Sequence, residues 1–207
     1  MKKLIFTLLA VCSATLLTAQ STIKLPVPDK KGGKPLMWCL NNRVSLRTFS
    51  SKKLTNQQLS NLLWAAFGVN RSDGKRTAPS ARNWQEIMIY AAMEQGLYLY
   101  DAKKHELTQV SEKDMRPEIG GQAFHVKAPV DLIFVADLDK MNCKPEEKSF
   151  YAGADTGFIS QNVYLFCASE GMSTVVCGYI DRNKLSKAMQ LPDSKKIIFA
   201  QPVGFPE

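Results

Sequence analysis

The apolar residues of this chain follow two different spacings, which together predict an alternation of helices and strands. Between residues 55 and 67, leucine, alanine and phenylalanine recur every three or four positions, which is typical of an amphipathic helix. Thr55 is a suitable N-cap for this helix, and Gly68 is a suitable end. The stretches Glu86–Ala92 and Val130–Ala136 are apolar throughout, so we expect two buried central strands.

The remaining elements complete a mixed pattern. Asp155–Gly171 is apolar nearly all round, which predicts a long helix inside a core or a subunit interface. Other elements are expected as a short helix over Pro35–Asn42, a hairpin over Gly96–Asp101 and His105–Val110, a strand over Ser173–Tyr179, a helix from its cap Asp181 to Leu191, and a strand over Ile197–Val203. Helices and strands interleave without a strict β-α-β order, so we predict one α+β domain over residues 35–207.

The N-terminus has the composition of a secretory signal. Lys2 and Lys3 precede an apolar run from Leu4 to Leu17, and the residues around Gln20 form a suitable cleavage zone. The run is short for a membrane span, and no second apolar run follows it. We therefore expect a signal peptide at residues 1–20, an exported, periplasmic protein with no stable membrane span, and a polar arm outside the core at residues 21–34.

The charge balance argues against a nucleic-acid partner. The formal net charge is +8, but the basic residues are scattered in short pairs and form no stripe with interleaved aromatics. The two histidines stand far apart and the cysteines lack metal-ligand spacing, so we expect no zinc site. An oxidising compartment permits disulfides, but the sequence does not choose a pairing among Cys39, Cys143, Cys167 and Cys177.

Two polar segments carry the candidate chemistry. Arg43, Ser45 and Arg47 alternate along the chain, so in an extended backbone they share one face. Two guanidiniums and a hydroxyl on one face suit a phosphate, because arginine binds this group through a bidentate fork. A solvated edge strand would show the same spacing, and spacing alone does not separate the two interpretations.

The second polar segment, Arg76–Gln85, lies between the amphipathic helix and the first central strand. It contains no acid, histidine or cysteine, so it is not typical of a hydrolase or metal site. Pro79 fixes the backbone, and small residues let a flat ligand approach. The amides of Asn83 and Gln85 both donate and accept, which suits the edge of a heterocycle. A polar loop without a ligand is the alternative.

Five motifs, in this order, resemble the nitroreductase superfamily of FMN-dependent oxidoreductases. They are Arg43–Phe49, Ala78–Gln85, Asp155-Thr156-Gly157 with Gln161-Asn162, Gly171–Gly178, and Pro202–Pro206. Leu63–Val69, and Gly96–Asp101 with His105-Glu106-Leu107, look like the branch that holds the azoline (thiazole/oxazole-forming) dehydrogenases. The resemblance implies a nitroreductase-like fold, with a central, mostly antiparallel sheet flanked by helices, and a domain-entwined homodimer with two FMN sites at its interface.

The resemblance also implies which residues bind FMN. Arg43 and Ser45, with Val44 between them, match the residues at the phosphate end. Arg47 matches the residue by the pyrimidine side of the ring, where positive charge stabilises the reduced flavin. The positions that match contacts from the second subunit are Pro79, Ser80, Ala81 and Asn83.

Two further segments complete the implied flavin site. Cys177 and Gly178, after Val176, match the strand end whose backbone N–H approaches flavin N5, the atom that accepts hydride. We expect the backbone of Cys177, and not its thiol, to matter. Gln122 is a looser match to an amide that contacts the ring. Family members usually continue into a basic extension beyond the position of Glu207. We therefore expect either a weaker phosphate clamp or compensation of the missing charge by Lys75, Arg76 or Arg82.

The implied activity is that of an FMN-dependent oxidoreductase with ping-pong chemistry. Hydride passes through flavin N5 to a small organic acceptor such as a nitroaromatic compound or a quinone, and the donor is NADH, NADPH or another reductant. No side chain needs to act as acid or base, because the cofactor carries the hard step. Two alternatives stay open at this point: an azoline-type flavin dehydrogenase or oxidase, and a flavin-binding protein without turnover.

Overall fold

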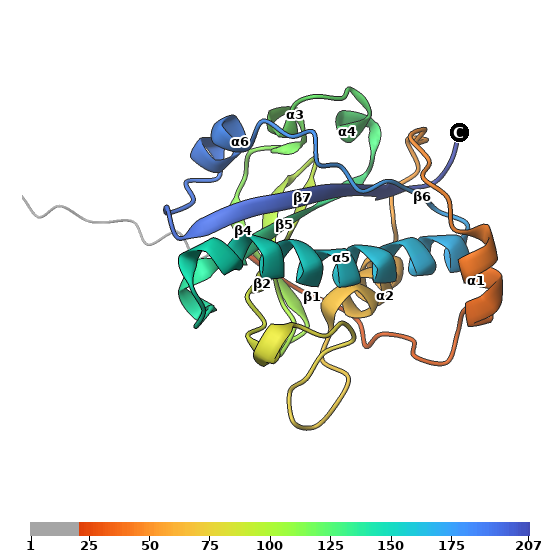
Figure 1. The fold of residues 1–207 in the computed structure, drawn as a ribbon. Coiled ribbons are helices and arrows are strands. Elements are labelled where there is room, and N and C mark those ends of the chain that lie inside the picture. Colours follow the sequence, from red (N-terminus) through yellow and green to blue (C-terminus); the bar gives the residue numbers. More distant parts are fainter. Residues whose placement is uncertain (1–20) are drawn as a thin grey trace, which may run out of the picture.

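A seven-stranded sheet is the frame of the computed structural model, which describes residues 21–207 (Figure 1). Its strands lie in the order β1-β4-β3-β2-β5-β7-β6, and every neighbouring pair is antiparallel. The strands are β1 (Thr22–Lys24), β2 (Ile87–Met93), β3 (Gly96–Asp101), β4 (Glu106–Ser111), β5 (Val130–Asp137), β6 (Ser173–Thr174) and β7 (Lys195–Gly204). The α+β fold with a central antiparallel sheet is therefore confirmed.

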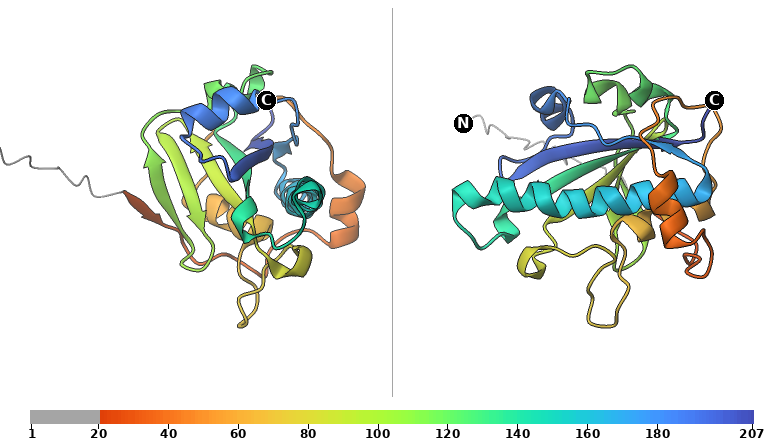
Figure 2. Two further views of the ribbon diagram at one scale, coloured as in Figure 1. Left: turned by 60° about the vertical axis from the view of Figure 1, so that its left-hand side comes forward. Right: turned by 45° about the vertical axis from the view of Figure 1, so that its right-hand side comes forward.

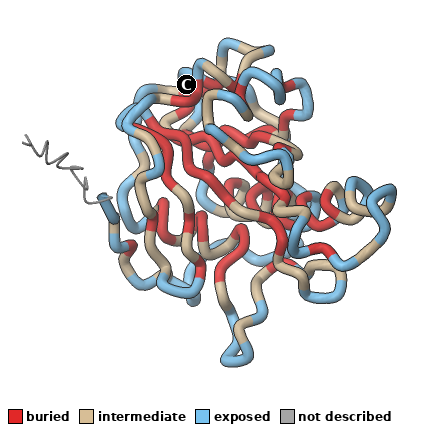
Figure 3. The backbone as a smooth tube through the Cα atoms, turned by 90° about the vertical axis from the view of Figure 1, so that its left-hand side faces the viewer, coloured by how far each residue is buried: buried red, intermediate tan, exposed pale blue. Residues whose placement is uncertain are grey.

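Helices cover both faces of this sheet (Figures 1 and 2). The helices are α1 (Leu36–Asn42), α2 (Asn56–Phe67), α3 (Arg116–Ile119), α4 (Phe124–Lys127), α5 (Pro145–Glu170) and α6 (Arg182–Ala188), with 3-10 turns η1 (Ala81–Asn83) and η2 (Leu138–Lys140). The long helix α5 packs with α2 on one face, around the larger core, and α3 and α6 enclose a second core on the other. In Figure 3, the buried stretches run through the central strands.

Burial on both sides explains why the central strands are apolar without alternation. Along β5, Leu132 and Phe134 belong to the larger core, whereas Ile133 and Val135 belong to the second core. All four side chains are fully buried. A strand with one solvent-exposed face would instead carry polar residues at every other position.

Helix α2 begins and ends as its sequence predicts. Thr55 and Gln58 form a reciprocal capping box, which satisfies two backbone N–H groups of the first turn. At the other end, Gly68 has a φ of −72°, so its role is not left-handed backbone. A Cβ at this position would lie 2.4 Å from Cδ1 of Trp64, and the glycine is needed because the chain turns closely against that indole.

The long helix α5 begins earlier than predicted. It begins at Pro145, ten residues before Asp155, because Pro145 sits in the first turn and Glu147 accepts the backbone N–H of Lys144 at 3.1 Å. The helix is also less uniform than expected, since one side packs in the core while Phe150 and Phe158 stay 72% and 50% exposed.

Two further predicted elements were too long, and one residue that was counted in an apolar strand is a buried acid. The strand expected over Ser173–Tyr179 contains only Ser173–Thr174, because the chain then leaves β7 and meets it again at a single bridge between Cys177 and Ala200. Helix α6 keeps its predicted cap, Asp181, but ends at Ala188. Glu86 stands just before β2, and its carboxyl side chain is wholly buried in a stretch that was expected to be apolar.

The segment 21–34 is not a free arm. Thr22–Lys24 pairs with β4 as an edge strand, and Leu25 packs into the larger core. The Ser60 hydroxyl donates to the carbonyl of Pro26 at 2.6 Å and thereby fastens the segment to α2. The signal sequence expected at residues 1–20 lies outside the described residues. Within residues 21–207, no helix combines the length and the hydropathy needed to cross a membrane.

Candidate functional site

Tyr164 of α5 contacts the first predicted segment, Arg43–Arg47. The Arg43 guanidinium carbon lies 5.0 Å from the centre of the Tyr164 ring, and the Ser45 hydroxyl is 2.8 Å from the Tyr164 hydroxyl. The backbone of Leu46 is held by a hydrogen bond from its N–H to the carbonyl of Thr174 at 3.0 Å. Arg43 and Arg47 are exposed, and neither forms an ion pair with any residue of the described chain. Both guanidiniums are therefore open to an anion.

The same tyrosine holds the segment after β6. Its hydroxyl accepts the backbone N–H of Val176 at 2.9 Å. The next N–H, that of Cys177, donates to the carbonyl of Ala200 at 2.7 Å and is therefore already used. Gly178 is exposed, and its N–H has no hydrogen-bond partner among residues 21–207. Of the two N–H groups predicted to meet a flavin, only that of Gly178 is free to do so.

The thiol of Cys177 is inert in this setting. Burial first, and then the charge of Asp131, raise its pKa to about 12, although the charge of Arg47 acts in the opposite direction. The thiol therefore stays protonated at neutral pH and is a poor nucleophile. Arg47 is therefore close enough to Cys177 for its charge to act on this thiol.

Gln122 lies beside this segment. The neighbouring Gly121 has a φ of 74°, and a Cβ there would lie 2.7 Å from the carbonyl oxygen of Tyr179. The turn is thus packed directly against the residue that follows Gly178. Behind it, His125 Nδ1 lies 2.5 Å from Asp131 Oδ2, and both side chains are buried. This buried pair fixes α4 on β5 and so holds the Gln122 turn in place.

The second predicted segment forms a strained turn at the other end of α5. The backbone N–H of Ala81 donates to Asp155 Oδ2 at 2.8 Å. Three residues that are not glycine have positive φ here, namely Arg82 at 49°, Asn83 at 57° and Gln85 at 50°. Residues in such conformations cluster at functional sites. Pro79 and Asn83 are exposed at the surface of this turn.

The amide side chains of Gln85 and Asn83 differ in which hydrogen-bonding groups they leave without a partner. The Gln85 Nε2 donates to Asn83 Oδ1 at 3.0 Å and to the carbonyl of Gly74 at 3.1 Å. Its oxygen accepts from Arg76 Nε at 2.9 Å, so the Gln85 amide holds the loop together. The Asn83 Nδ2 has no partner in the described part of the chain, and it is the donor that this turn offers outward.

The basic residues that were expected to supply extra charge are engaged locally. Lys75 pairs with Asp73 at 2.9 Å, and the Arg82 guanidinium donates to the carbonyl of Asn142 at 3.4 Å. Arg76 is bonded to Gln85 and lies 4.4 Å from the centre of the Phe67 ring. Within a single copy of the chain, none of the three points freely at the Arg43–Arg47 segment.

One chain does not bring the two predicted groups together. The turn is fastened to α5 at Asp155, whereas Arg43, Ser45 and Val176 meet at Tyr164, nine residues later. Nine residues of helix separate the two anchors by roughly 13 Å. In Figure 1, the turn lies beside the N-terminal half of α5 and α1 lies beside its C-terminal half.

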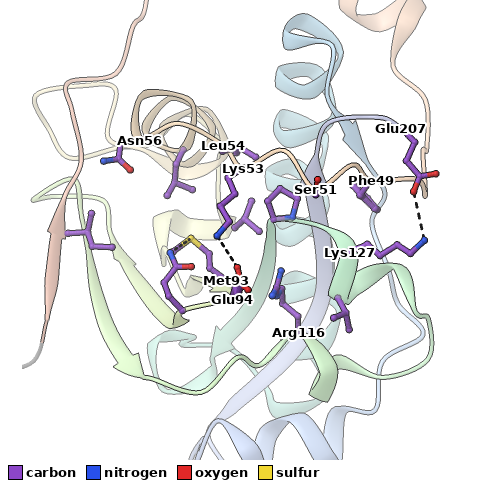
Figure 4. Close-up of a pocket in the computed structure, with 16 residues that line it drawn as sticks. Phe49, Ser51, Lys53, Leu54, Asn56, Met93, Glu94, Arg116, Lys127 and Glu207 are labelled. Atoms are coloured by element: carbon purple, nitrogen blue, oxygen red, sulfur yellow. Dashed lines mark hydrogen bonds and ion pairs between the residues drawn. The ribbon is translucent and has the colours of Figure 1, made fainter.

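A cavity that Phe49 helps to line lies apart from the predicted flavin residues. It encloses about 560 Å³ and is lined by Phe49, Leu54 and Met93 among others (Figure 4). Its cations are already paired, Lys53 with Glu94 at 2.9 Å and Lys127 with Glu207 at 3.8 Å. None of the predicted flavin residues lines it.

Three residues that matter for this arrangement were not predicted. Tyr164 had been counted as one more apolar residue of the helix, although the polar tip of a buried tyrosine usually finds a partner. Asp155 was noted only as part of a motif, and Glu86 only as the start of a strand. Residues 21–207 contain no group of three metal-ligating side chains, and Cys39, Cys143, Cys167 and Cys177 are all free thiols.

Comparison with known proteins gives consistent matches. The sequence profile of the Nitroreductase family matches residues 40–205. A candidate nitroreductase of Methanocaldococcus jannaschii is 29% identical over 194 residues, which are 88% of this chain and 96% of that protein. Among solved structures, a candidate nitroreductase from Ralstonia eutropha JMP134 has a TM-score of 0.86 at 41% identity, with 90% of each chain covered.

A more distant solved structure has a named activity. The NADPH:FMN oxidoreductase from Vibrio harveyi, solved in complex with NAD+, has a TM-score of 0.65 at 18% identity. The match covers 83% of this chain and 69% of that one. At this identity the likeness concerns the fold alone.

Proposed function

The chain belongs to the nitroreductase family of oxidoreductases, and we propose that it binds FMN and passes hydride equivalents from a donor to a small organic acceptor. The observation that carries this proposal is the set of open donors around Tyr164. Two unpaired guanidiniums, the Ser45 hydroxyl and the free N–H of Gly178 lie along two segments that one tyrosine holds together.

This donor set fits the chemistry of FMN. A phosphate needs charged and hydroxyl donors in a compact group, which Arg43 and Ser45 provide. A planar ring with alternating donors and acceptors needs single N–H and amide groups at its edge, which Gly178, Gln122 and the free Nδ2 of Asn83 can offer. The residues present therefore fit this cofactor.

Bound FMN would supply the hydride chemistry, with N5 as the accepting atom. The protein's part is then binding and electrostatics. Arg47 places a positive charge beside the Val176–Gly178 segment, where it favours negative charge on a bound ring. The Cys177 thiol, kept protonated by burial, takes no part. No side chain is assigned as a general acid or base.

A homodimer supports the proposal because the two predicted groups are apart in one chain. A second copy can bring its Pro79–Asn83 turn to the Arg43–Arg47 segment of the first. The surface offers an interface for this: α1 exposes Leu36, Met37 and Trp38, and α5 exposes Phe158. Apolar residues gathered on neighbouring helices in this way are typical of a protein–protein contact.

The hydride donor and acceptor are proposed from the chemistry of the cofactor and from the similar solved structures. The Vibrio harveyi relative carries NADPH and FMN in its name, so a nicotinamide nucleotide is the first donor to try. A nitroaromatic compound or a quinone is the proposed acceptor. Activity of the azoline dehydrogenase type is the finer alternative, motivated by Leu63–Val69. Export to the periplasm is also proposed, from residues 1–20, and would call for a donor that occurs there.

A shared-site experiment tests cofactor and architecture together. Purified protein should release FMN, and not FAD, on denaturation. Arg43→Ala and Asn83→Ala homodimers should both bind FMN weakly, because each damages both sites. In a heterodimer of one mutant chain of each kind, one site inherits both lesions and the other has a native Arg43 and a native Asn83.

Tandem-tag purification of the heterodimer gives the deciding measurement. About one tight FMN per dimer is expected, from the geometry of a two-fold interface. If both contacts came from one chain, every site would stay damaged and the flavin content would not exceed that of the parent mutants. Recovery of FAD, or failure to take up FMN after reconstitution, would reject the cofactor itself.

A further inference from the structure

Glu86 is a buried acid with no donor. Its side chain is 0% exposed, and both carboxyl oxygens lack a hydrogen-bond partner among residues 21–207. Asp155 of α5, which is 3% exposed, is close enough to the Glu86 carboxyl group to raise its pKa. Asp155 in turn accepts the backbone N–H of Ala81, at the start of the strained turn. Two buried carboxyl groups thus stand side by side behind the turn that would meet the flavin.

No cation of residues 21–207 forms an ion pair with either carboxyl group, and the charge of Lys140 only partly offsets the effect of burial on the Glu86 pKa. Lys140, on η2, is exposed and donates to the carbonyl of Gln85 at 3.3 Å. Arg82 donates to the carbonyl of Asn142, and Lys148 of α5 donates to the carbonyl of Leu138. The side chain of Asp137, at the end of β5, caps its own turn by accepting the N–H of Asp139. Every charged group near the pair is therefore committed elsewhere.

Two neighbouring buried carboxylates cannot both stay ionised without a large cost. A proton on Glu86 removes one charge and supplies the missing donor, which can then bond to Asp155. The negative charge left on Asp155 strengthens its bond to the Ala81 N–H, because a charged acceptor makes the stronger hydrogen bond.

The Ala81–Asp155 bond matters because the turn is strained. Arg82, Asn83 and Gln85 all have positive φ, so the turn needs outside support to keep its shape. The bond from Gln85 N–H to Ser80 Oγ lies within the turn and does not fasten it to α5. Asp155 supplies the hydrogen bond to the helix, beside the edge-to-face contact of Trp84 with Tyr151 of α5.

We propose that Glu86 and Asp155 share one proton, and that this proton positions the Ser80–Asn83 turn for the flavin site. The inference rests on the proposed function for its consequence in binding. It makes Glu86 a positioning residue, because it acts through Asp155 and touches no ligand. Burial in the first place, and the neighbouring Asp155 carboxylate, raise the pKa of Glu86 to about 7, so the pair would lose its proton just above neutral pH.

The first test compares FMN binding at pH 6 and at pH 8.5. The wild-type dissociation constant should rise roughly tenfold over this range, because repulsion between two ionised carboxylates pushes Asp155 away from the Ala81 N–H and so weakens the hydrogen bond that holds the turn. Glu86→Gln keeps a neutral donor at every pH, so its affinity should stay at the acidic wild-type value. Glu112→Gln is the matched control, since Glu112 is exposed, and it should keep the wild-type pH dependence.

The second test needs no flavin. In apoprotein with ¹³C-labelled glutamate carboxyl groups, one resonance should titrate near pH 7 and be absent from Glu86→Gln. The amide resonance of Ala81 should shift with the same midpoint, because its N–H bonds to Asp155. Both midpoints are read from the wild-type protein, and Glu86→Gln serves only to assign the carboxyl resonance.

The outcomes separate the two proposals. A Glu86 resonance that titrates below pH 5 rejects the shared proton. A midpoint near 7 with an unmoved Ala81 amide, or with the same pH dependence of FMN binding in wild type and Glu86→Gln, rejects the positioning role. A protein that binds no FMN at pH 6 rejects the proposed function, and the apoprotein spectra still decide the inference.

Discussion

At the scale of the residue, Tyr164 shows how one side chain can organise a site without chemistry of its own. Its ring lies under the Arg43 guanidinium, and its hydroxyl meets both the Ser45 hydroxyl and the Val176 N–H. The alternation of Arg43 and Ser45 correctly suggested a common neighbourhood, because both contact this ring. The tyrosine itself could not be singled out, since it lies in a run of apolar helix residues whose orientation depends on tertiary packing.

Arg47 gives the sharpest test at this scale. Its charge reaches the Val176–Gly178 segment, as its effect on the Cys177 thiol indicates. We expect Arg47→Gln to lower the reduction potential of bound FMN by tens of millivolts, because a cation beside the ring no longer favours the reduced, negatively charged form. Spectroscopic titration against a dye of known potential measures this change.

Arg43→Gln is the matched control for this prediction. The substitution is chemically the same, but Arg43 stacks on Tyr164 at the proposed phosphate end. It should weaken FMN binding and leave the potential nearly unchanged. Equal shifts in both variants, or none in Arg47→Gln, would mean that the Arg47 charge does not act on the ring.

Glu86 illustrates what the residue pattern hides. A glutamate at the start of a strand is ordinarily solvated, and almost no glutamate is fully buried without a partner. Here the partner is another acid, so ionising Glu86 in the folded chain costs on the order of 3 kcal/mol. Only the packing of α5 against the turn reveals this, and no local sequence signal could have done so.

At the scale of the element, periodicity predicted the centre of the sheet and the helix α2 correctly. Both have strong local signals, in continuous apolar runs and in a capping sequence. The start of α5 was missed because its first turn is polar from Glu146 to Ser149 and Gly153 follows soon after, although Pro145 and the two glutamates after it are typical of a first turn. The extent of β6 was missed because the strand ends where its pairing with β7 ends, and its own sequence does not determine that pairing.

The capping box of α2 makes a prediction for this element. Thr55→Ala removes the side-chain acceptor for the Gln58 N–H, which is 3.2 Å away, and breaks the reciprocal pair. We expect the free energy of unfolding to fall by about 1 kcal/mol. Urea denaturation followed by far-ultraviolet circular dichroism measures it. Ser51→Ala, in the same connecting segment, should change the stability by only a few tenths of a kcal/mol, since the Ser51 side chain has no hydrogen bond within residues 21–207. Equal losses in the two variants would show that the cap contributes nothing.

At the scale of the whole molecule, the decisive observation is the distance between the two predicted flavin-binding segments. The Arg43–Arg47 segment and the Pro79–Asn83 turn were predicted to act on one ligand, yet they are fastened to α5 at residues roughly 13 Å apart. Sequence alone could name both segments, because each has its own local composition. Only the family resemblance, and not the composition of either segment, implied that they meet across two chains, since that depends on an interface.

The exposed side of α5 gives the last prediction. Gly153 and Gly157 are one helical turn apart, and a Cβ at either position would meet nothing within 4 Å in the single chain. In a monomer, Gly157→Ala should therefore stabilise the helix by roughly 0.5–1 kcal/mol. In the proposed dimer, with Phe158 at the contact, the larger Gly157→Leu should push the two copies apart.

Size-exclusion chromatography with light scattering separates these cases. Wild-type protein should elute with the mass of two chains, and Gly157→Leu with the mass of one, with FMN content falling in parallel because each site needs both copies. Lys103→Leu adds the same side chain at the exposed β3–β4 turn and should leave both properties unchanged. A monomeric wild type that still holds FMN tightly would contradict the shared site, since one chain would then have to bring Arg43 and Asn83 to the same ligand across the length of α5 that separates their anchors.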